Sequence, residues 1–150
     1  MAEIYIQTST KDIKVQKMVK ARYLLCASVG GQQMTRDGTV CMNNATAKAA
    51  ALAALVQALE RFQKAAVIKI YISDDYVRNM LILNMPHRWE QNGWHKIRYN
   101  SDLKYAGYWK RIRQIMSAHA VNYAGADEIK DNQTLKEMEW RMNHVKNGRV

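Results

Sequence analysis

The sequence is poor in the features that mark secreted, zinc-binding and membrane-spanning proteins. Its two cysteines, Cys26 and Cys41, form no CxxC pattern and have no flanking histidine, which argues against a structural zinc site. The longest apolar run, Ala49 to Val56, is far shorter than the roughly 20 residues of a membrane-spanning helix. The N-terminus lacks the basic start and apolar core of a signal peptide. We therefore expect a cytoplasmic protein with buried free thiols and no membrane partner.

Acidic residues are also scarce. The chain has 13 Asp and Glu against 23 Lys and Arg, a formal net charge of +10. Because the release of counterions drives basic proteins onto polyanions, this imbalance favours a nucleic-acid partner. No internal repeat, low-complexity tract or linker divides the sequence, so residues 1–150 are expected to form a single domain.

The apolar pattern of the first half predicts three strands and then a long helix. The strands are expected at 3–9, 21–28 and 32–42. The third strand is expected to be interrupted at Asp37-Gly38. Apolar residues then recur at helical spacing from Leu52 to Phe62, and Asn43 or Asn44 is the expected N-cap of that helix. Three consecutive strands suggest an antiparallel meander.

The second half alternates strands and helices. The expected elements are a strand at 66–72, helices at 74–83 and 103–119, a strand at 120–123 and a helix at 131–145. Pro86 is expected to close the unit that contains the first of these helices. A strand, a helix and a strand in succession imply a right-handed crossover and a parallel pair. The predicted fold class is therefore α/β, a mixed five-stranded sheet in the order β-β-β-α-β-α-α-β-α with helices on both faces.

Several short motifs, in their order and spacing, resemble the ribonuclease H family. They are Glu3-Ile4-Tyr5-Ile6, Asn43-Asn44 before the alanine-leucine helix, Tyr76-Val77-Arg78, Asn92-Gly93-Trp94, and Asn100-Ser101-Asp102-Leu103 ahead of Trp109. The resemblance implies a ribonuclease HI-like fold. Members of this family cleave the RNA strand of RNA–DNA hybrids with acidic side chains that hold two Mg²⁺ ions about 3.5–4 Å apart.

The acids that this resemblance requires are missing. The matching positions are Gln7, Ala47, Ser73 and Lys136, and none of these residues is a carboxylic acid. Hard divalent cations need oxygen ligands with negative charge, so we expect no catalytic residue, no metal ligand and no cofactor. Asp74 and Asp75 follow Ser73 directly, and we interpret them as the first residues of a helix rather than a metal site.

Basic and aromatic residues supply the expected nucleic-acid surface. Lysine and arginine neutralise phosphates, and exposed aromatic rings stack on bases or sugars. The resemblance implies that the paired asparagines contact a strand in the minor groove, with helix capping as the alternative. The expected nucleic-acid-binding residues are Lys14, Lys17, Asn43, Asn44, Arg88, Trp94, Lys96, Arg98 and Lys104. In the alternative interpretation, the tryptophans of this segment pack onto the sheet and its cations form a solvated surface.

Three functions follow from these observations. The first is a catalytically degenerate ribonuclease H-like domain that binds nucleic acid, either an RNA–DNA hybrid or a duplex. The second is a protein-interaction module whose former active-site face, with Lys48 and Lys136, docks an acidic protein. The third is an active RNA–DNA hybrid ribonuclease with displaced metal ligands, and only this alternative requires Mg²⁺.

Overall fold

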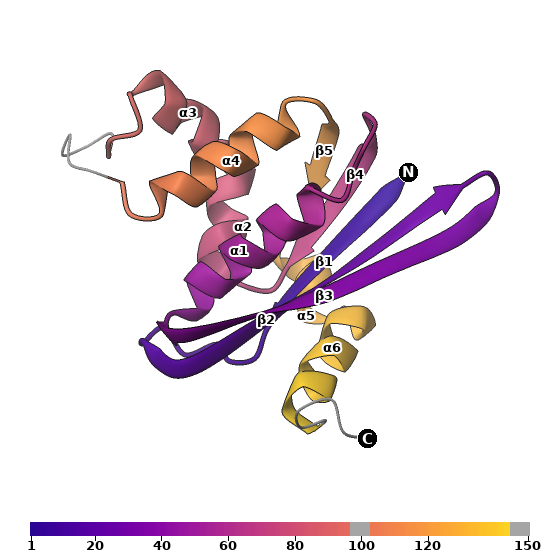
Figure 1. Cartoon of the computed structure of the whole chain (residues 1–150), viewed down its shortest axis with the longest axis horizontal. Helices are drawn as coiled ribbons and strands as arrows, with labels where there is room; N and C mark the ends of the chain where they lie inside the picture. Colours follow the sequence, from indigo (N-terminus) through magenta and orange to yellow (C-terminus); the bar gives the residue numbers. More distant parts are fainter. Residues whose placement is uncertain (97–102, 145–150) are drawn as a thin grey trace.

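A mixed five-stranded sheet organises the chain in the computed structural model, which describes residues 1–96 and 103–144 (Figure 1). The strands are β1 (Ala2–Thr8), β2 (Gln16–Val29), β3 (Gln32–Ala45), β4 (Val67–Ile72) and β5 (Ala120–Tyr123). Their order in the sheet is β3-β2-β1-β4-β5. The first three strands form an antiparallel meander, whereas β4 is parallel to both β1 and β5. The predicted fold class is confirmed.

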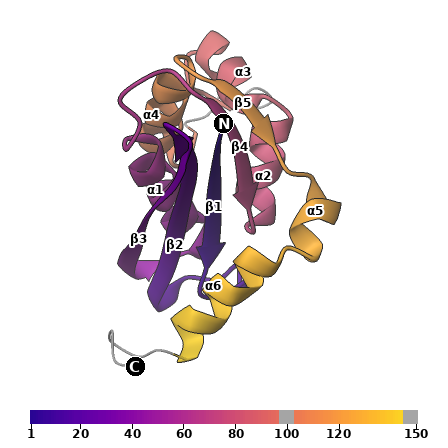
Figure 2. The same ribbon diagram turned by 90° about the vertical axis from the view of Figure 1, so that its right-hand side faces the viewer.

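Helices cover both faces of this sheet (Figure 2). They are α1 (Ala47–Leu59), α2 (Asp75–Ile82), α3 (Met85–Gln91), α4 (Ala106–Met116), α5 (Ala126–Lys130) and α6 (Gln133–His144). The first four share the main core on one face, and α6 packs against β1 on the other. Within the described ranges, no helix is long and apolar enough to cross a membrane.

The helices α3 and α5 are absent from the predicted element order. Pro86 does not close a unit but lies in the first turn of α3. Proline suits that place because its fixed φ matches the helix and its missing N–H has no intrahelical partner there. The short α5 follows Gly125 and carries Asp127 and Glu128 in its first turn, where acidic side chains stabilise the helix dipole.

The third strand is continuous through Asp37-Gly38, which corrects the predicted interruption. Gly38 lies opposite Tyr23 of β2. A Cβ atom at Gly38 would lie 2.5 Å from Cε2 of the Tyr23 ring, so glycine is required by packing rather than by a turn. The hydroxyl of Tyr23 accepts a hydrogen bond from Nε of Arg61 at 3.0 Å.

The cysteines are less buried than expected. Cys26 is half-buried and Cys41 is exposed. Alternation along β3 points Val40 into the core and Cys41 away from it. The main helix contact of β3 is with α1, on the core side, and the Cys41 thiol on the other side is exposed.

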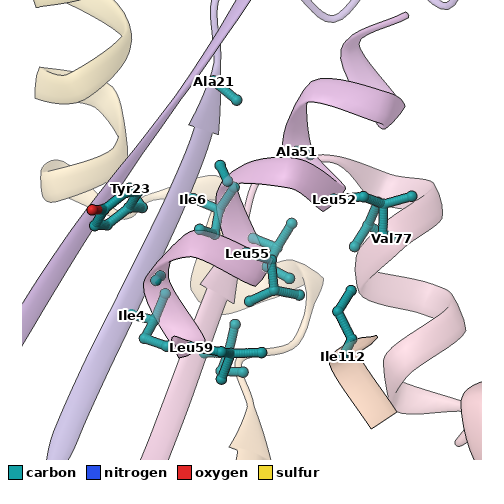
Figure 3. Packing of buried hydrophobic residues seen from close by; sticks show 14 of the residues in the cluster. Ile4, Ile6, Ala21, Tyr23, Ala51, Leu52, Leu55, Leu59, Val77 and Ile112 are labelled. Carbon is teal, nitrogen blue, oxygen red and sulfur yellow. The ribbon is translucent and has the colours of Figure 1, made fainter. Parts of the chain in front are cut away.

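The main core forms where α1 packs on the sheet (Figure 3). Leu52, Leu55 and Leu59 of α1 are fully buried. Leu55 and Leu59 lie toward Ile4 and Ile6 of β1, whereas Leu52 lies toward Val77 of α2. The intervening alanines of α1 are small, which lets the helix approach the strands closely. Trp109 is also fully buried, as expected for a tryptophan that packs the helices onto the sheet.

Thr46, not either asparagine, is the N-cap of α1. Its Oγ1 accepts a hydrogen bond from the Ala49 N–H at 3.2 Å. Asn43 and Asn44 belong to β3, and Asn43 lies opposite Met18 of β2. The capping alternative for the two asparagines is therefore wrong, because β3 continues to Ala45 before the helix begins.

Candidate functional site

A cavity of about 300 Å³ opens where β1 and β4 end and α6 crosses the sheet. These two strands are parallel, so their carboxyl ends lie side by side. The polar residues that line this β1–α6 cavity are Gln7, Lys11, Ser73, Asp75, Arg78, Lys130, Lys136 and Glu139. Three of the four positions expected to have lost their acids, Gln7, Ser73 and Lys136, are thus brought together. Ala47, the fourth, is buried in the main core at the start of α1.

Gln7 ties the end of β1 to α6. Its side chain is only 3% exposed, and its Nε2 donates to the carbonyl of Thr8 at 3.2 Å and to Oε2 of Glu139 at 3.3 Å. Ser73 follows β4, and its backbone N–H donates to the carbonyl of Ile6 at 3.0 Å. The Ser73 hydroxyl is buried and has no hydrogen-bond partner among the described residues.

Arg78 forms another wall of the cavity. Its Nη1 donates to the carbonyl of Ile72 at 3.0 Å, and its Nη2 donates to Oδ1 of Asp75 at 2.5 Å. The arginine side chain is 6% exposed and the Asp75 side chain is 83% exposed. The Asp75 carboxylate is therefore already engaged by a fixed guanidinium group.

Asp74 starts a helix, as interpreted from the sequence. Its Oδ2 accepts a hydrogen bond from the Val77 N–H at 3.0 Å, which caps α2. Burial raises the pKa of the Asp74 carboxyl, and the Val77 N–H and the Lys48 cation oppose that rise. The Asp74 side chain is therefore used to hold the helix.

The residues around the cavity do not fit a two-metal site. Its acids, Asp75 and Glu139, face four cations, Lys11, Arg78, Lys130 and Lys136. In residues 1–96 and 103–144, no group of three or more His, Cys, Asp or Glu side chains could hold a metal ion. Two-metal chemistry needs several carboxylates at one point, and this donor set does not supply them.

Three of the predicted nucleic-acid-binding residues meet at one end of the β2–β3 ribbon. Lys17, Asn43 and Asn44 are exposed, and Asn43 of β3 lies opposite Met18, the residue next to Lys17 in β2. Neither asparagine side chain makes a hydrogen bond within the part of the chain that the structure describes. Asn44 has a φ of 51°, the left-handed region. Lys14, also exposed, precedes β2 at the same end of the sheet.

A hydrogen bond joins this end of the ribbon to α4. The hydroxyls of Thr46 and Tyr105 lie 2.9 Å apart, and Tyr105 immediately precedes α4. The ammonium group of Lys104 lies 5.3 Å from the centroid of the Tyr105 ring. The turn that carries Lys104 therefore lies beside the start of α1, although Thr46 and Tyr105 are 59 residues apart in the sequence.

In the segment around α3, the tryptophans pack against the core and the basic residues are exposed. Trp89 is buried and stacks at a tilt on Trp109, with ring centroids 5.2 Å apart. Trp94 is half-buried against the core, and the Lys110 ammonium lies 5.9 Å from its ring. Arg88 and Lys96 are exposed. Helix α3, which carries Arg88, lies beside α4 (Figure 1). Arg98 lies outside the described residues.

Sequence reasoning missed part of the cavity and misplaced one lysine. Lys11, Lys130 and Glu139 carried no motif, whereas Arg78 belongs to Tyr76-Val77-Arg78 and could have been included. Lys48 was expected to share a face with Lys136. Instead, its ammonium group lies 4.0 Å from the centroid of the Tyr76 ring, and Lys48 does not line the cavity.

The chain is similar in sequence to ribonucleases H. It is 31% identical to the ribonuclease H of Parvibaculum lavamentivorans over 94 residues, which are 63% of this chain and 55% of that protein. The chain spans about half the length of the curated relatives it matches. No family model matches it.

The fold is similar to that of solved ribonuclease H structures. LC9-RNase H1, a type 1 RNase H with the type 2 active-site motif, superposes with a TM-score of 0.67 at 17% identity over 91% of this chain and 69% of that one. LC11-RNase H1, solved in complex with RNA/DNA hybrid, gives a TM-score of 0.58 at 12% identity, covering 91% of this chain and 92% of that one. The chain therefore has a ribonuclease H-like fold, and part of its sequence is similar to that of ribonucleases H.

Proposed function

We propose that this chain is a ribonuclease H-like domain that binds an RNA–DNA hybrid or a nucleic-acid duplex and does not cleave it. The observation that carries the proposal is a cluster of exposed residues near the start of α1: Lys17, Asn43 and Asn44 lie at one end of the β2–β3 ribbon, and Lys104 precedes Tyr105, whose hydroxyl lies 2.9 Å from that of Thr46. The similarity to ribonucleases H, and to a solved relative in complex with RNA/DNA hybrid, supports the same ligand class.

The side chains of this cluster suit a nucleic-acid backbone and groove. Each asparagine amide offers two N–H donors and a carbonyl acceptor, which match 2′-hydroxyls and base edges in a shallow minor groove. Lysine ammonium groups neutralise phosphates and release counterions. Because the asparagine side chains have no hydrogen-bond partner among residues 1–96 and 103–144, a bound strand would not have to displace one.

The cavity at the same end of the sheet supports binding without cleavage. Gln7, Ser73 and Lys136 stand at the positions where the family resemblance requires acids. Its lysines repel Mg²⁺, and its two carboxylates are both hydrogen-bonded within the protein. A hybrid could therefore lie over the cavity without being hydrolysed.

Binding of a fluorescent RNA–DNA hybrid, followed by anisotropy in EDTA over a series of salt concentrations, tests the proposal. We expect the affinity to fall as salt rises. The double variant Lys17→Gln/Lys104→Gln should bind more weakly, and the slope of log K against log salt should shrink by about 1 for each phosphate that is no longer neutralised. Lys64→Gln is the matched control, because Lys64 is exposed near the start of β4, away from the cluster. An affinity independent of salt would contradict an electrostatic interface.

The asparagines are tested separately from the charges. Asn43→Ala and Asn44→Gly should each weaken hybrid binding and leave the salt slope unchanged, because they remove amides and no charge. Glycine is chosen at residue 44 because it tolerates the positive φ without strain. Unchanged affinity in both variants would exclude the asparagines from the interface.

Two further measurements separate the alternative functions. A labelled hybrid incubated with Mg²⁺ or Mn²⁺ at high protein concentration should stay intact, and cleavage would indicate an active nuclease with displaced ligands. Purification from lysate treated with nuclease should remove bound nucleic acid. An acidic protein that remains bound after that treatment, with no hybrid affinity in the anisotropy assay, would favour a protein-interaction module.

A further inference from the structure

We propose that the β1–α6 cavity is a metal-independent phosphate site, in which lysine ammonium groups hold a phosphate or phosphodiester group directly. The proposal deepens the proposed function, since a nucleic-acid backbone is one source of such a group. The phosphate site can also be tested separately from that function, because inorganic phosphate alone should bind in the cavity.

The charges that line the cavity favour an anion. The Asp75 carboxylate forms an ion pair with Arg78 at 2.5 Å, so the charges of these two residues offset each other. Lys11, Lys130 and Lys136 then remain against the single carboxylate of Glu139. Among the described residues, none of these three lysines forms an ion pair. Their mutual repulsion is relieved when an anion lies between them.

Buried donors without partners point to the same ligand class. Ser73 is 8% exposed, and its hydroxyl has no hydrogen-bond partner in the described part of the chain. Nε of Arg78, a residue that is 5% exposed, is buried and unpaired in the same way. Burying a donor without a partner costs free energy, and an oxygen of a bound anion could recover it once a small side-chain rotation turns the buried donor toward the cavity. Both residues line the cavity.

The arrangement suits a tetrahedral group better than a planar carboxylate. The donors come from separate elements: Lys11 follows β1, Ser73 follows β4, Lys130 ends α5 and Lys136 lies on α6. A phosphate offers oxygens in several directions to such a set, and lysine binds phosphate as a point charge without requiring a planar geometry. About 300 Å³ is ample room for a phosphate and several waters.

Titration of the protein with inorganic phosphate in EDTA, followed by backbone amide NMR, tests the inference. Sodium chloride of equal ionic strength serves as the reference. We expect saturable shifts at Gln7, Ser73 and Lys136. In the double variant Lys130→Gln/Lys136→Gln the phosphate affinity should fall at least tenfold, whereas Lys64→Gln should behave as the native protein. Shifts that do not saturate, or that persist in the double variant, would overturn the proposal.

Two additional measurements identify the chemical class of the ligand. Ser73→Ala should weaken phosphate binding several-fold if the buried hydroxyl donates to it, and circular dichroism establishes that each variant is folded. The double lysine variant provides the same test on exposed side chains if the buried substitution unfolds the protein. Acetate should leave the cavity signals unchanged, and a response equal to that of phosphate would overturn the phosphate assignment in favour of a carboxylate-bearing partner.

The same NMR experiment with an unlabelled RNA–DNA hybrid separates this inference from the proposed function. If phosphate saturates the cavity and no hybrid binds at any salt concentration, the phosphate site stands and the nucleic-acid function falls. If hybrid binds at Asn43 and Asn44 while neither ligand shifts the cavity signals, the function stands and the phosphate site falls. Shifts at both places in the presence of EDTA support both the phosphate site and the nucleic-acid function.

Discussion

The two faces of the sheet hold their helices with very different amounts of packing. On one face α1 buries nine of its 13 residues against β1, β2 and the other helices. On the other face α6 buries only Leu135 and Met138, which pack with Tyr5 in a small cluster. The stacked rings of Tyr5 and Tyr71, with centroids 4.6 Å apart, complete that second face.

This difference separates the part that maintains the fold from the part that forms the cavity. Lys136 and Glu139 lie on α6, and Lys130 ends the short α5. These three charged side chains of the cavity therefore lie on helices that bury few residues. In many proteins such elements unfold locally at a low free-energy cost. A ligand could shift α6 without disturbing the main core.

The largest expected effect is the loss of a fully buried α1 side chain. Leu55→Ala should lower the free energy of unfolding by about 2–5 kcal/mol, the range for truncating leucine in a well-packed core. Urea unfolding followed by circular dichroism measures it. A loss no larger than that of the corresponding α6 variant, Leu135→Ala, would mean that the α1 face is no better packed than the other.

Leu135→Ala on α6 tests the second face and should cost less, about 2 kcal/mol, at the low end of the range for leucine. The effect should appear as faster amide hydrogen exchange in α6, while exchange in α1 is unchanged. Trp140→Ala, on the same helix but 58% exposed, is the control and should have little effect. Equal acceleration in α1 and α6 would break the contrast between the faces.

Thr46→Ala removes the cap of the well-packed helix and should cost about 1 kcal/mol. Asn43→Ala should cost only a few tenths of a kcal/mol, because the side chain is exposed and makes no hydrogen bond to residues 1–96 or 103–144. Thermal or urea unfolding of the two variants measures both losses of stability. A larger loss of stability from the asparagine variant would restore the capping role that the structure excludes.

The smallest expected effect is the pH dependence contributed by Asp74, at the start of α2. Burial raises its pKa above the ordinary 3.8, so the folded state holds the proton more tightly than the unfolded state. Native stability should therefore lose a contribution as pH rises through the interval between 3.8 and the raised pKa. Asp74→Asn keeps the cap without ionising. In urea unfolding, the free energy of unfolding of the variant minus that of the native protein should be larger at pH 7 than at pH 3. A difference that does not change with pH would contradict the raised pKa of Asp74.

Much of the fold could be predicted because its signals are local. Leu52, Leu55 and Leu59 repeat at helical spacing, and this locates α1 without any tertiary information. The position of its cap could not be read in the same way. Asn43, Asn44 and Thr46 are all good capping residues, and the choice among them depends on how far β3 pairs with β2. Gly38 raised the same difficulty, since the Tyr23 ring that requires it lies on another strand.

The residues of the candidate site could also be predicted only in part. Gln7 and Ser73 could be brought together from the sequence, because parallel strands end at the same edge of a sheet. Lys11 and Lys130 could not, since one lies in an irregular connection and the other on a single-turn helix placed by tertiary packing. The sequence predicts which positions lack the acids of the family pattern, whereas only the structure shows which cations line the cavity at those positions.

The long β2–β3 ribbon also bears on how the protein behaves at high concentration. An exposed edge strand offers unpaired N–H and C=O groups on which another chain can add a strand. One edge, β5, has only four residues. The other, β3, has 14, and its exposed first half carries Arg36 and the ion pair of Asp37 with Arg22. Charges at that place disfavour edge-to-edge stacking, so we expect this sheet to resist growth into aggregates through addition of a further strand.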